Sequence, residues 1–183
     1  MVKNLDKPIG LLGGSFDPAH KGHLTISKIA IKKIRLKNVF WVVARKNPFK
    51  DQPFYSLSER MLIAKKLAST TKKIKVVYLD KILKSSRSIA TINYFVSKKK
   101  LKNIYFIIGS DNLIKFHKWK NWKKIVKLVK LIVFSRKGYD MKGKKSIVAK
   151  YLKNKIIFIK NKPIIISSTK LRDRINKNFN GSR

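Results

Sequence analysis

Two histidines lie three residues apart at the end of a glycine-containing segment that follows a short apolar run. Within it, Gly13 and Gly14 allow the backbone to turn sharply and to approach a ligand with no Cβ atom in the way. A helix that begins near Gly22 would present free backbone N–H groups and a partial positive charge, which suit a phosphate group. His20 and His23 stand at this helix start, where imidazoles can donate hydrogen bonds to phosphate oxygens during group transfer. The spacing therefore indicates phosphate chemistry.

The same histidines are also a candidate metal site. Asp17 is the one carboxylate near them at ligand spacing, so phosphate binding is the favoured interpretation. The chain has no cysteine, which excludes disulfides, thiolate metal sites and a cysteine nucleophile.

A second candidate anion site lies at residues 166–172, between an apolar stretch and a predicted short helix. The hydroxyls of Ser168 and Thr169, the backbone amides of a helix start and Arg172 one turn later form a plausible clasp for phosphate. An ordinary Ser or Thr N-cap would explain one of the hydroxyls without any ligand.

The middle of the chain carries residues suited to a nucleotide. Asp111 comes just after an expected strand, where a carboxylate can accept hydrogen bonds from ribose hydroxyls. Trp119 offers a flat surface for a pyridine ring, although packing within a helix is the alternative. For Trp122 we favour helix packing, and His117 is expected to be a solvated helix residue.

Six apolar runs rich in Val, Ile and aromatic residues predict strands that are buried on both faces. They are Ile9–Leu12, Val39–Ala44, Ile74–Leu79, Ile104–Ile108, Leu131–Phe134 and Ile156–Ile159. Amphipathic segments predict helices at His23–Ile34, Ser58–Ala68 with Ser58 as N-cap, Ser88–Lys99, Asn112–Leu128, Ser146–Leu152 and Thr169–Asn176. This alternation predicts one α/β domain over residues 1–183, with a parallel sheet covered on both faces. The main motifs then fall at the carboxyl ends of strands, where such folds bind ligands.

The formal net charge of +38 raises nucleic acid or an anionic membrane as partners. However, only eight of the 46 Lys and Arg residues are Arg, and the Lys residues are spread along the whole chain. Nucleic-acid readers favour Arg, so no specific nucleic acid is expected, although the field would steer anionic substrates. The N-terminus lacks a signal-peptide pattern and the apolar runs are too short to span a bilayer, which predicts a cytoplasmic protein without membrane contact.

The segment Gly13–His23 resembles GGSFDPxHxGH, a form of the HxGH signature of class I nucleotidyl transferases, and matches it at every defined position. Residues 166–172 resemble the ISSTxxR element of the same superfamily. Residues 108–119 resemble the GADNLxxFxxW element of bacterial nicotinate-nucleotide adenylyltransferases, with Ser110 in place of Ala. Asn47–Lys50 resembles their NPxK loop.

One element departs from this family. Residues 89–95 occupy the place of its SYTxDTL segment, but only Thr91 is retained, and Ala90 and Asn93 replace the usual Tyr and Asp. The resemblance nevertheless extends from Ile9 to about Ile175.

The resemblance implies a Rossmann-like doubly wound parallel sheet with helices on both faces. It implies transfer of AMP from ATP to nicotinate mononucleotide, giving deamido-NAD and pyrophosphate in NAD biosynthesis, with Mg²⁺ carried on the ATP phosphates and no metal ligands from the protein. Implied catalytic residues are His20, His23 and Arg172. Implied ATP-binding residues are Gly13, Gly14, Ser15, Phe16, Gly22, Gly109, Asp111, Ser168 and Thr169, and implied acceptor-binding residues are Lys50, Thr91 and Trp119.

Two alternatives stay open from the sequence. One is an enzyme of the same class with a different acceptor, such as nicotinamide mononucleotide or phosphopantetheine. The other is a nucleic-acid-binding protein that keeps the fold without the activity. The sequence leaves the oligomeric state open.

Overall fold

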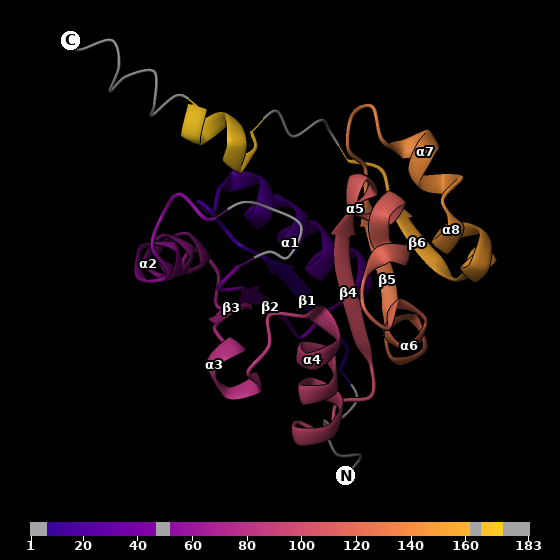
Figure 1. The fold of residues 1–183 in the computed structure, drawn as a ribbon, viewed down its shortest axis with the longest axis horizontal. Coiled ribbons are helices and arrows are strands. Elements are labelled where there is room, and N and C mark those ends of the chain that lie inside the picture. The colour runs from indigo at the N-terminus through magenta and orange to yellow at the C-terminus, as the bar shows by residue number, and fades with distance from the viewer. Residues whose placement is uncertain (1–6, 47–51, 162–165, 174–183) are drawn as a thin grey trace.

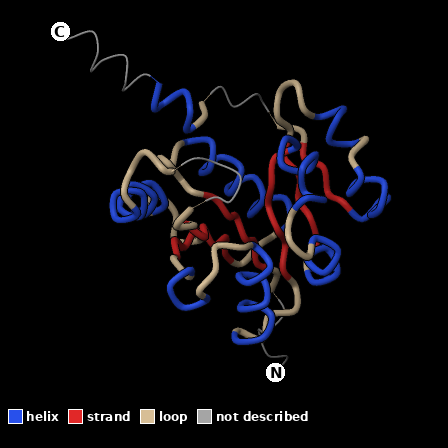
Figure 2. Tube along the Cα trace, viewed as in Figure 1, coloured by secondary structure: helices blue, strands red, loops and turns tan. Residues whose placement is uncertain are grey.

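Six parallel strands form a single sheet that runs through the molecule (Figures 1 and 2). They are β1 (Ile9–Gly14), β2 (Asn38–Val43), β3 (Ile74–Val77), β4 (Ile104–Gly109), β5 (Lys130–Phe134) and β6 (Ile156–Ile159). Their order in the sheet is β3-β2-β1-β4-β5-β6, and every neighbouring pair is parallel. The structure is a computed structural model that describes residues 7–46, 52–161 and 166–173. All six predicted strands and the Rossmann-like α/β class are confirmed.

Both faces of the sheet are buried because successive strand residues point to opposite sides. In β4, Phe106 and Ile108 belong to one hydrophobic cluster, while Ile107 between them belongs to the other. In β5, Leu131 and Ile132 divide in the same way. This two-sided burial is the physical reason that the strands have nearly continuous apolar sequences.

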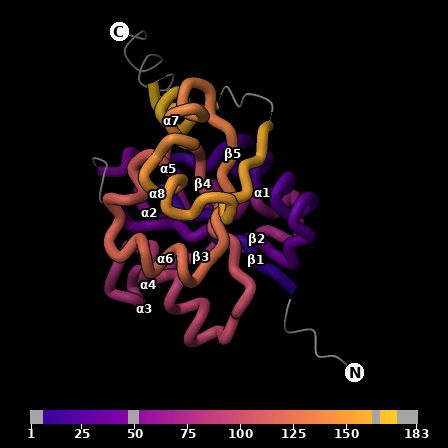
Figure 3. The backbone as a smooth tube through the Cα atoms, turned by 90° about the vertical axis from the view of Figure 1, so that its right-hand side faces the viewer, coloured from indigo at the N-terminus to yellow at the C-terminus, as the bar shows by residue number. Residues whose placement is uncertain are grey.

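Helices cover both sides of the sheet, as Figure 3 shows with α1 on one side and α4, α5, α6 and α8 on the other. The helices are α1 (Lys21–Ile34), α2 (Leu57–Ala68), α3 (Asp80–Leu83), α4 (Ser88–Asn93), α5 (Ser110–Lys115), α6 (Trp122–Leu128), α7 (Asp140–Lys144) and α8 (Ile147–Leu152). A π-helical turn, Tyr94–Lys98, continues α4, and short 3₁₀ turns occupy Phe116–Lys118 and Lys153–Lys155. Residues 168–173 are also helical.

The predicted helix Asn112–Leu128 was wrong, because the chain breaks between α5 and α6. Trp119 has an extended backbone, and Asn121 adopts the left-handed conformation with φ 57°. A continuous helical pattern therefore conceals a turn that puts Trp119 outside both helices.

Other helix boundaries also needed correction. The N-cap of α2 is Ser56 instead of Ser58, because the Ser56 side chain and Glu59 form a capping box. The short helices α3 and α7 were not predicted at all. The last predicted helix is present over residues 168–173, and its predicted end at 174–176 lies outside the described residues.

The strand order reverses between β1 and β4, which lie side by side at the centre of the sheet. At such a point the connections leave in opposite directions, so a crevice opens at the carboxyl ends of the two strands. The glycines Gly13, Gly14 and Gly109 stand at these two strand ends. The fold thus places the glycine–histidine segment and the Asp111 segment at one edge of the sheet.

Arg60, in α2, joins three loops near this edge. Its side chain is only 2 % exposed and donates four hydrogen bonds to backbone carbonyl oxygens. The acceptors are Ser15 and Ala44 at 2.7 Å, Arg45 at 3.0 Å and Tyr55 at 3.1 Å. One buried guanidinium therefore ties the turn after β1 to the loop after β2 and to the start of α2.

We expect Arg60→Met to lower the free energy of unfolding by about 3 kcal/mol or more, because four carbonyl groups lose their donor in a buried site. Arg35→Met is the matched control, since Arg35 is exposed at the end of α1 and should change stability by less than about 0.5 kcal/mol. Urea unfolding followed by tryptophan fluorescence measures both. Equal stability of the two variants would contradict the role of Arg60.

Candidate active site

The turn after β1 presents its glycines to open space instead of to protein. A Cβ atom placed on Gly13 would come no nearer than 4.0 Å to another side chain, and one on Gly14 would meet only the Phe16 ring at ordinary distances. Both glycines line a cavity. The protein's own packing therefore does not require glycine here, whereas a ligand that closely approaches the backbone would.

His20 and His23 cap the N-terminus of α1 with their own side chains. Nδ1 of His20 accepts a hydrogen bond from the backbone N–H of Gly22 at 3.1 Å, and Nδ1 of His23 accepts one from the backbone N–H of His20 at 3.2 Å. This is the reciprocal arrangement of a capping box, built from two imidazoles. Because a backbone N–H can only donate, each neutral ring carries its proton on Nε2. Both rings are thus held as Nε2–H donors.

His20 is also held in the neutral form. Burial lowers the pKa of His20 to about 4, and the positive charge of Arg136 contributes to the same shift. A neutral imidazole can donate from Nε2 at pH 7 without first losing or gaining a proton.

Aromatic packing fixes the position of the His23 ring. The ring lies 4.7 Å from Phe16, which stacks on Trp41 at 5.2 Å. Phe16 is 2 % exposed and has a φ of 48°, a left-handed conformation that costs a non-glycine residue roughly 1–2 kcal/mol. Below this stack, Ser27 donates to the backbone carbonyl of His23 at 2.8 Å and accepts from the Trp41 indole at 2.8 Å. Ring packing and hydrogen bonds to buried residues therefore hold the histidine pair in place.

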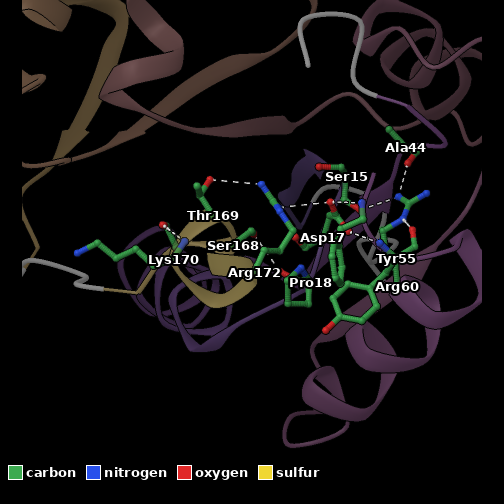
Figure 4. Close-up of polar contacts among 12 residues, drawn as sticks. Ser15, Asp17, Pro18, Ala44, Tyr55, Arg60, Ser168, Thr169, Lys170 and Arg172 are labelled. Atoms are coloured by element: carbon green, nitrogen blue, oxygen red, sulfur yellow. Dashed lines mark hydrogen bonds and ion pairs between the residues drawn. The ribbon is translucent and has the colours of Figure 1, made fainter. Parts of the chain in front are cut away.

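The helix at residues 168–173 packs directly on the turn after β1 (Figure 4). Ser168 donates to the carbonyl of Pro18 at 3.0 Å. One Arg172 nitrogen donates to the carbonyl of Asp17 at 2.5 Å and lies 3.3 Å from its carboxylate, and the other lies 3.5 Å from Thr169 Oγ1. Two predicted phosphate segments from opposite parts of the sequence are thereby brought together.

Asp17 organises this junction from the opposite side. Its side chain is buried, and its two carboxylate oxygens accept the backbone N–H groups of Phe54 and Tyr55, each at 2.9 Å. Together with Arg172, these donors account for both oxygens. The sequence suggested Asp17 only as a candidate metal ligand, whereas the structure uses it to join three segments.

A further cation, Arg136, faces the Asp111 segment. Its guanidinium donates to Asp111 Oδ2 at 2.6 Å. The other carboxylate oxygen of Asp111, Oδ1, is buried and has no hydrogen-bond partner within residues 7–46, 52–161 and 166–173. It lies so close over Gly109 that any Cβ atom there would collide with it. Arg136 was missed by the sequence reasoning, although an Arg two residues beyond a predicted strand in a Lys-rich chain was a usable signal.

A cavity of about 270 Å³ opens beside the glycine turn. Of the predicted residues, Gly13, Gly14, Ser15, Thr91 and Trp119 line it. Arg87, Lys118 and Lys120 add positive charge to its wall, and sequence reasoning gave none of them a role.

The Trp119 ring is backed by a second aromatic ring within this cavity wall. It stacks on Phe116 at 4.8 Å and 26° and meets Phe106 edge-on at 6.1 Å. Trp122, in contrast, packs against Tyr151 away from the cavity lining. Thr91 is buried in α4, on the cavity wall.

The remaining predicted residues do not line this cavity. They are His20, His23, Gly22, Phe16, Gly109, Asp111, Ser168, Thr169 and Arg172. Of these, Phe16 is buried beneath His23. Lys50 lies outside the described residues.

The described ranges contain no group of three or more His, Cys, Asp and Glu side chains placed to hold a metal ion. Across the same ranges, no helix is both long enough and apolar enough to cross a bilayer.

A family model described as cytidylyltransferase-like matches residues 11–174, so the chain belongs to that family. Within it, the probable nicotinate-nucleotide adenylyltransferase of Pelagibacter ubique is 47 % identical over 165 residues, which cover 90 % of this chain and 91 % of the relative. That of Endomicrobium trichonymphae is 32 % identical over 172 residues, covering 93 % and 87 %. The chain is therefore a member of the nicotinate-nucleotide adenylyltransferase family, as its motifs predicted.

Solved structures agree on the fold. The nicotinic acid mononucleotide adenylyltransferase of Plasmodium falciparum, solved in complexes with NaAD and with APC, superposes with a TM-score of 0.73 in both cases. The sequence identities are 19 % and 18 %, and the match covers 91 % of this chain and 83 % of the other.

We expect the imidazole of His20 to titrate near pH 4, so that the ring stays neutral between pH 5 and 8. Arg136→Gln should raise this pKa, because it removes a nearby positive charge and leaves only the effect of burial. Proton NMR of the His20 ring across pH 3–8 measures both values. A midpoint near 6.5 in the unaltered protein would contradict the burial of this ring.

Proposed function

We propose that this protein transfers AMP from ATP to nicotinate mononucleotide, forming deamido-NAD and pyrophosphate. An oxygen of the acceptor's phosphate attacks the α-phosphorus of ATP, a new P–O bond forms, and the bond to the β-phosphate oxygen breaks with its electrons on pyrophosphate. Because the acceptor phosphate is already ionised at neutral pH, the step needs no general base. Catalysis then consists of positioning and of stabilising charge on phosphate oxygens.

The observation that carries this proposal is the pair of histidine caps at the start of α1. The hydrogen bonds from Gly22 and His20 N–H are accepted at both Nδ1 atoms, so each neutral ring carries its proton on Nε2 and is held in a fixed orientation. Both rings lie at the N-terminus of a 14-residue helix, whose dipole favours negative charge there. Donors that need no rearrangement act most strongly on charge that develops during the reaction.

The ATP phosphates would be held between this helix start and the segment at 168–172. Ser168, Thr169 and Arg172 are the proposed contacts. The bonds of Ser168 to Pro18 and of Arg172 to Asp17 and Thr169 support that placement. Mg²⁺ bound to the ATP phosphates would neutralise charge on the leaving pyrophosphate. Since the described residues offer no cluster of three ligands, the ion would be held mainly by phosphate oxygens.

The ribose and the pyridine ring have separate candidate sites. Asp111 Oδ1 is a buried acceptor without a hydrogen-bond partner in the part of the chain that the structure describes, which suits a ribose hydroxyl. Trp119, backed by Phe116, would stack on the pyridine ring inside the cavity, next to Thr91. Lys50 keeps the acceptor-phosphate role that the sequence predicts. The chain would act as one domain in the cytoplasm, where ATP is abundant, without a specific nucleic-acid partner.

Purified protein incubated with ATP, Mg²⁺ and nicotinate mononucleotide should form deamido-NAD and pyrophosphate. His23→Ala should reduce turnover by roughly 10²–10³, because it removes a donor to the transition state. His117→Ala is the matched control and should keep near-normal turnover, since the His117 ring contacts the Ile114 carbonyl on a separate turn. Chromatography of the dinucleotide product measures each rate.

Nicotinamide mononucleotide and phosphopantetheine belong in the same assay as competing acceptors. Preferential use of either one would replace the proposed acceptor while keeping the reaction class. No product from any acceptor, beside an active control enzyme, would refute nucleotidyl transfer.

Trp119→Ala should raise the KM for nicotinate mononucleotide by roughly tenfold with a smaller change in kcat, because a stacking contact of about 1–1.5 kcal/mol is lost. Trp122→Ala, which removes an equal side chain outside the cavity lining, should leave this KM nearly unchanged. Steady-state kinetics at saturating ATP separates the two. Similar KM values in both variants would contradict the proposed contact between Trp119 and the acceptor.

A further inference from the structure

Asp140, the first residue of α7, gathers a dense set of hydrogen bonds near the carboxyl end of β5. Its Oδ1 accepts from the Ser110 hydroxyl at 2.7 Å and from the backbone N–H of Arg136 at 2.9 Å. Its Oδ2 accepts from the Ser135 hydroxyl at 2.6 Å. The Arg136 N–H also lies 3.1 Å from Ser110 Oγ. One carboxylate and one hydroxyl thus converge on the backbone of a single residue.

The Asp140 carboxylate stays charged in this setting. Burial alone would raise the pKa of Asp140, but the hydrogen bonds from Ser135, Ser110 and the Arg136 N–H, with the charge of Lys144, hold it below its usual range. Hydrogen bonds to an ionised acceptor are about twice as strong as neutral ones. The contact is therefore suited to fixing a loop.

Ser110 is fully buried, at 0 % exposure. It is also the one residue of its segment that departs from the GADNLxxFxxW pattern, which has Ala at this place. The extra hydroxyl is shielded from solvent, and among the residues that the structure describes it bonds to Asp140 and to the backbone N–H of Arg136. Gly143 allows this approach, because a Cβ atom there would lie 3.1 Å from the Ser110 carbonyl oxygen.

The side chain of Arg136 extends from the hydrogen bonds around Asp140 to the candidate active site. Its guanidinium pairs with Asp111 at 2.6 Å and is near enough to His20 to affect that ring's charge. More than half of the Arg136 side chain is exposed, at 52 %, so little packing holds it in place. Its position depends on the backbone from which it extends.

We propose that Ser110 and Asp140 are positioning residues, which fix the backbone at Arg136 so that its guanidinium supplies a further cation to the phosphates of the bound nucleotides. The proposal rests on the proposed nucleotidyl transfer. Neither the Ser110 hydroxyl nor the Asp140 carboxylate touches substrate in this proposal. Both affect the reaction through the position of Arg136.

A double-mutant cycle tests this link. Asp140→Asn and Arg136→Ala should each lower kcat/KM for ATP, by about tenfold and by about ten- to a hundredfold. The double variant should be no worse than Arg136→Ala alone, because the carboxylate acts through an arginine that is already absent. Ser110→Ala, a milder change, should give a smaller loss that also disappears in the Arg136→Ala background. Multiplying losses in the double variants would overturn the proposal.

Ser146→Ala is the matched control for Ser110→Ala. Ser146 is also buried, at 8 % exposure, and its hydroxyl accepts the backbone N–H of Ala149 at the start of α8. It should lower stability without changing kcat/KM. An equal kinetic loss in Ser146→Ala would mean that Ser110 has only a structural role, and would overturn the proposal.

A second measurement does not depend on activity. NMR titration of His20 in Asp140→Asn and Ser110→Ala should show a higher pKa than in the unaltered protein, because Arg136 is no longer held nearby. The His23 ring also lies 4.0 Å from the His20 ring, and it is present in every variant. A change in the pKa of His20 therefore reports on the position of Arg136. Unchanged His20 titration in both variants would overturn the proposal. If the unaltered protein formed no dinucleotide, the proposed function would fail, and this titration would still decide whether Ser110 and Asp140 position Arg136.

Discussion

The site depends on two hydrogen bonds in which imidazole rings take the place of the usual serine and glutamate caps of a helix. By accepting backbone N–H groups at Nδ1, His20 and His23 stabilise the start of α1 and fix their own orientation at the same time. The same contacts exclude a second use of these nitrogen atoms, for a metal or for a proton. The same two hydrogen bonds therefore stabilise the helix and orient the imidazole rings, and the Phe16–Trp41 stack packs against this pair.

Carboxylates are rare in this chain, with eight Asp and Glu against 46 Lys and Arg, yet four of them surround the site. Asp17, Asp80 and Asp111 lie just beyond strands, and Asp140 begins α7. Asp17 and Asp80 accept backbone N–H groups from neighbouring loops, and Asp140 accepts that of Arg136 in its own loop. In a chain that strongly repels itself, these few negative charges hold loops where several cations meet. The main structural role of these carboxylates is to bind the backbone of loops.

Strands were predictable because a parallel sheet buried on both faces requires continuous apolar runs, of which Ile104–Ile108 is one. The contact between the two segments predicted to bind phosphate was expected, because the sequence places each of them after an apolar run, and their binding of phosphate stays a prediction. The break at Trp119 was not, since a left-handed Asn121 leaves the helical pattern of the sequence unchanged. Arg60 and Arg136 were also missed, because three of the four carbonyl partners of Arg60 and the carboxylate partner of Arg136 lie 15 to 45 residues away, a separation that local spacing does not reveal.

The contact between Asp17 and Arg172 spans 155 residues of sequence. Contacts between such distant residues form late, because the chain entropy of closing the loop must first be offset by the intervening sheet. During synthesis, the histidine turn emerges 155 residues before Arg172, the partner of Asp17. A nascent chain would therefore lack the contact between Asp17 and Arg172 until residue 172 has left the ribosome, and the sheet formed by then would be the template on which this contact closes.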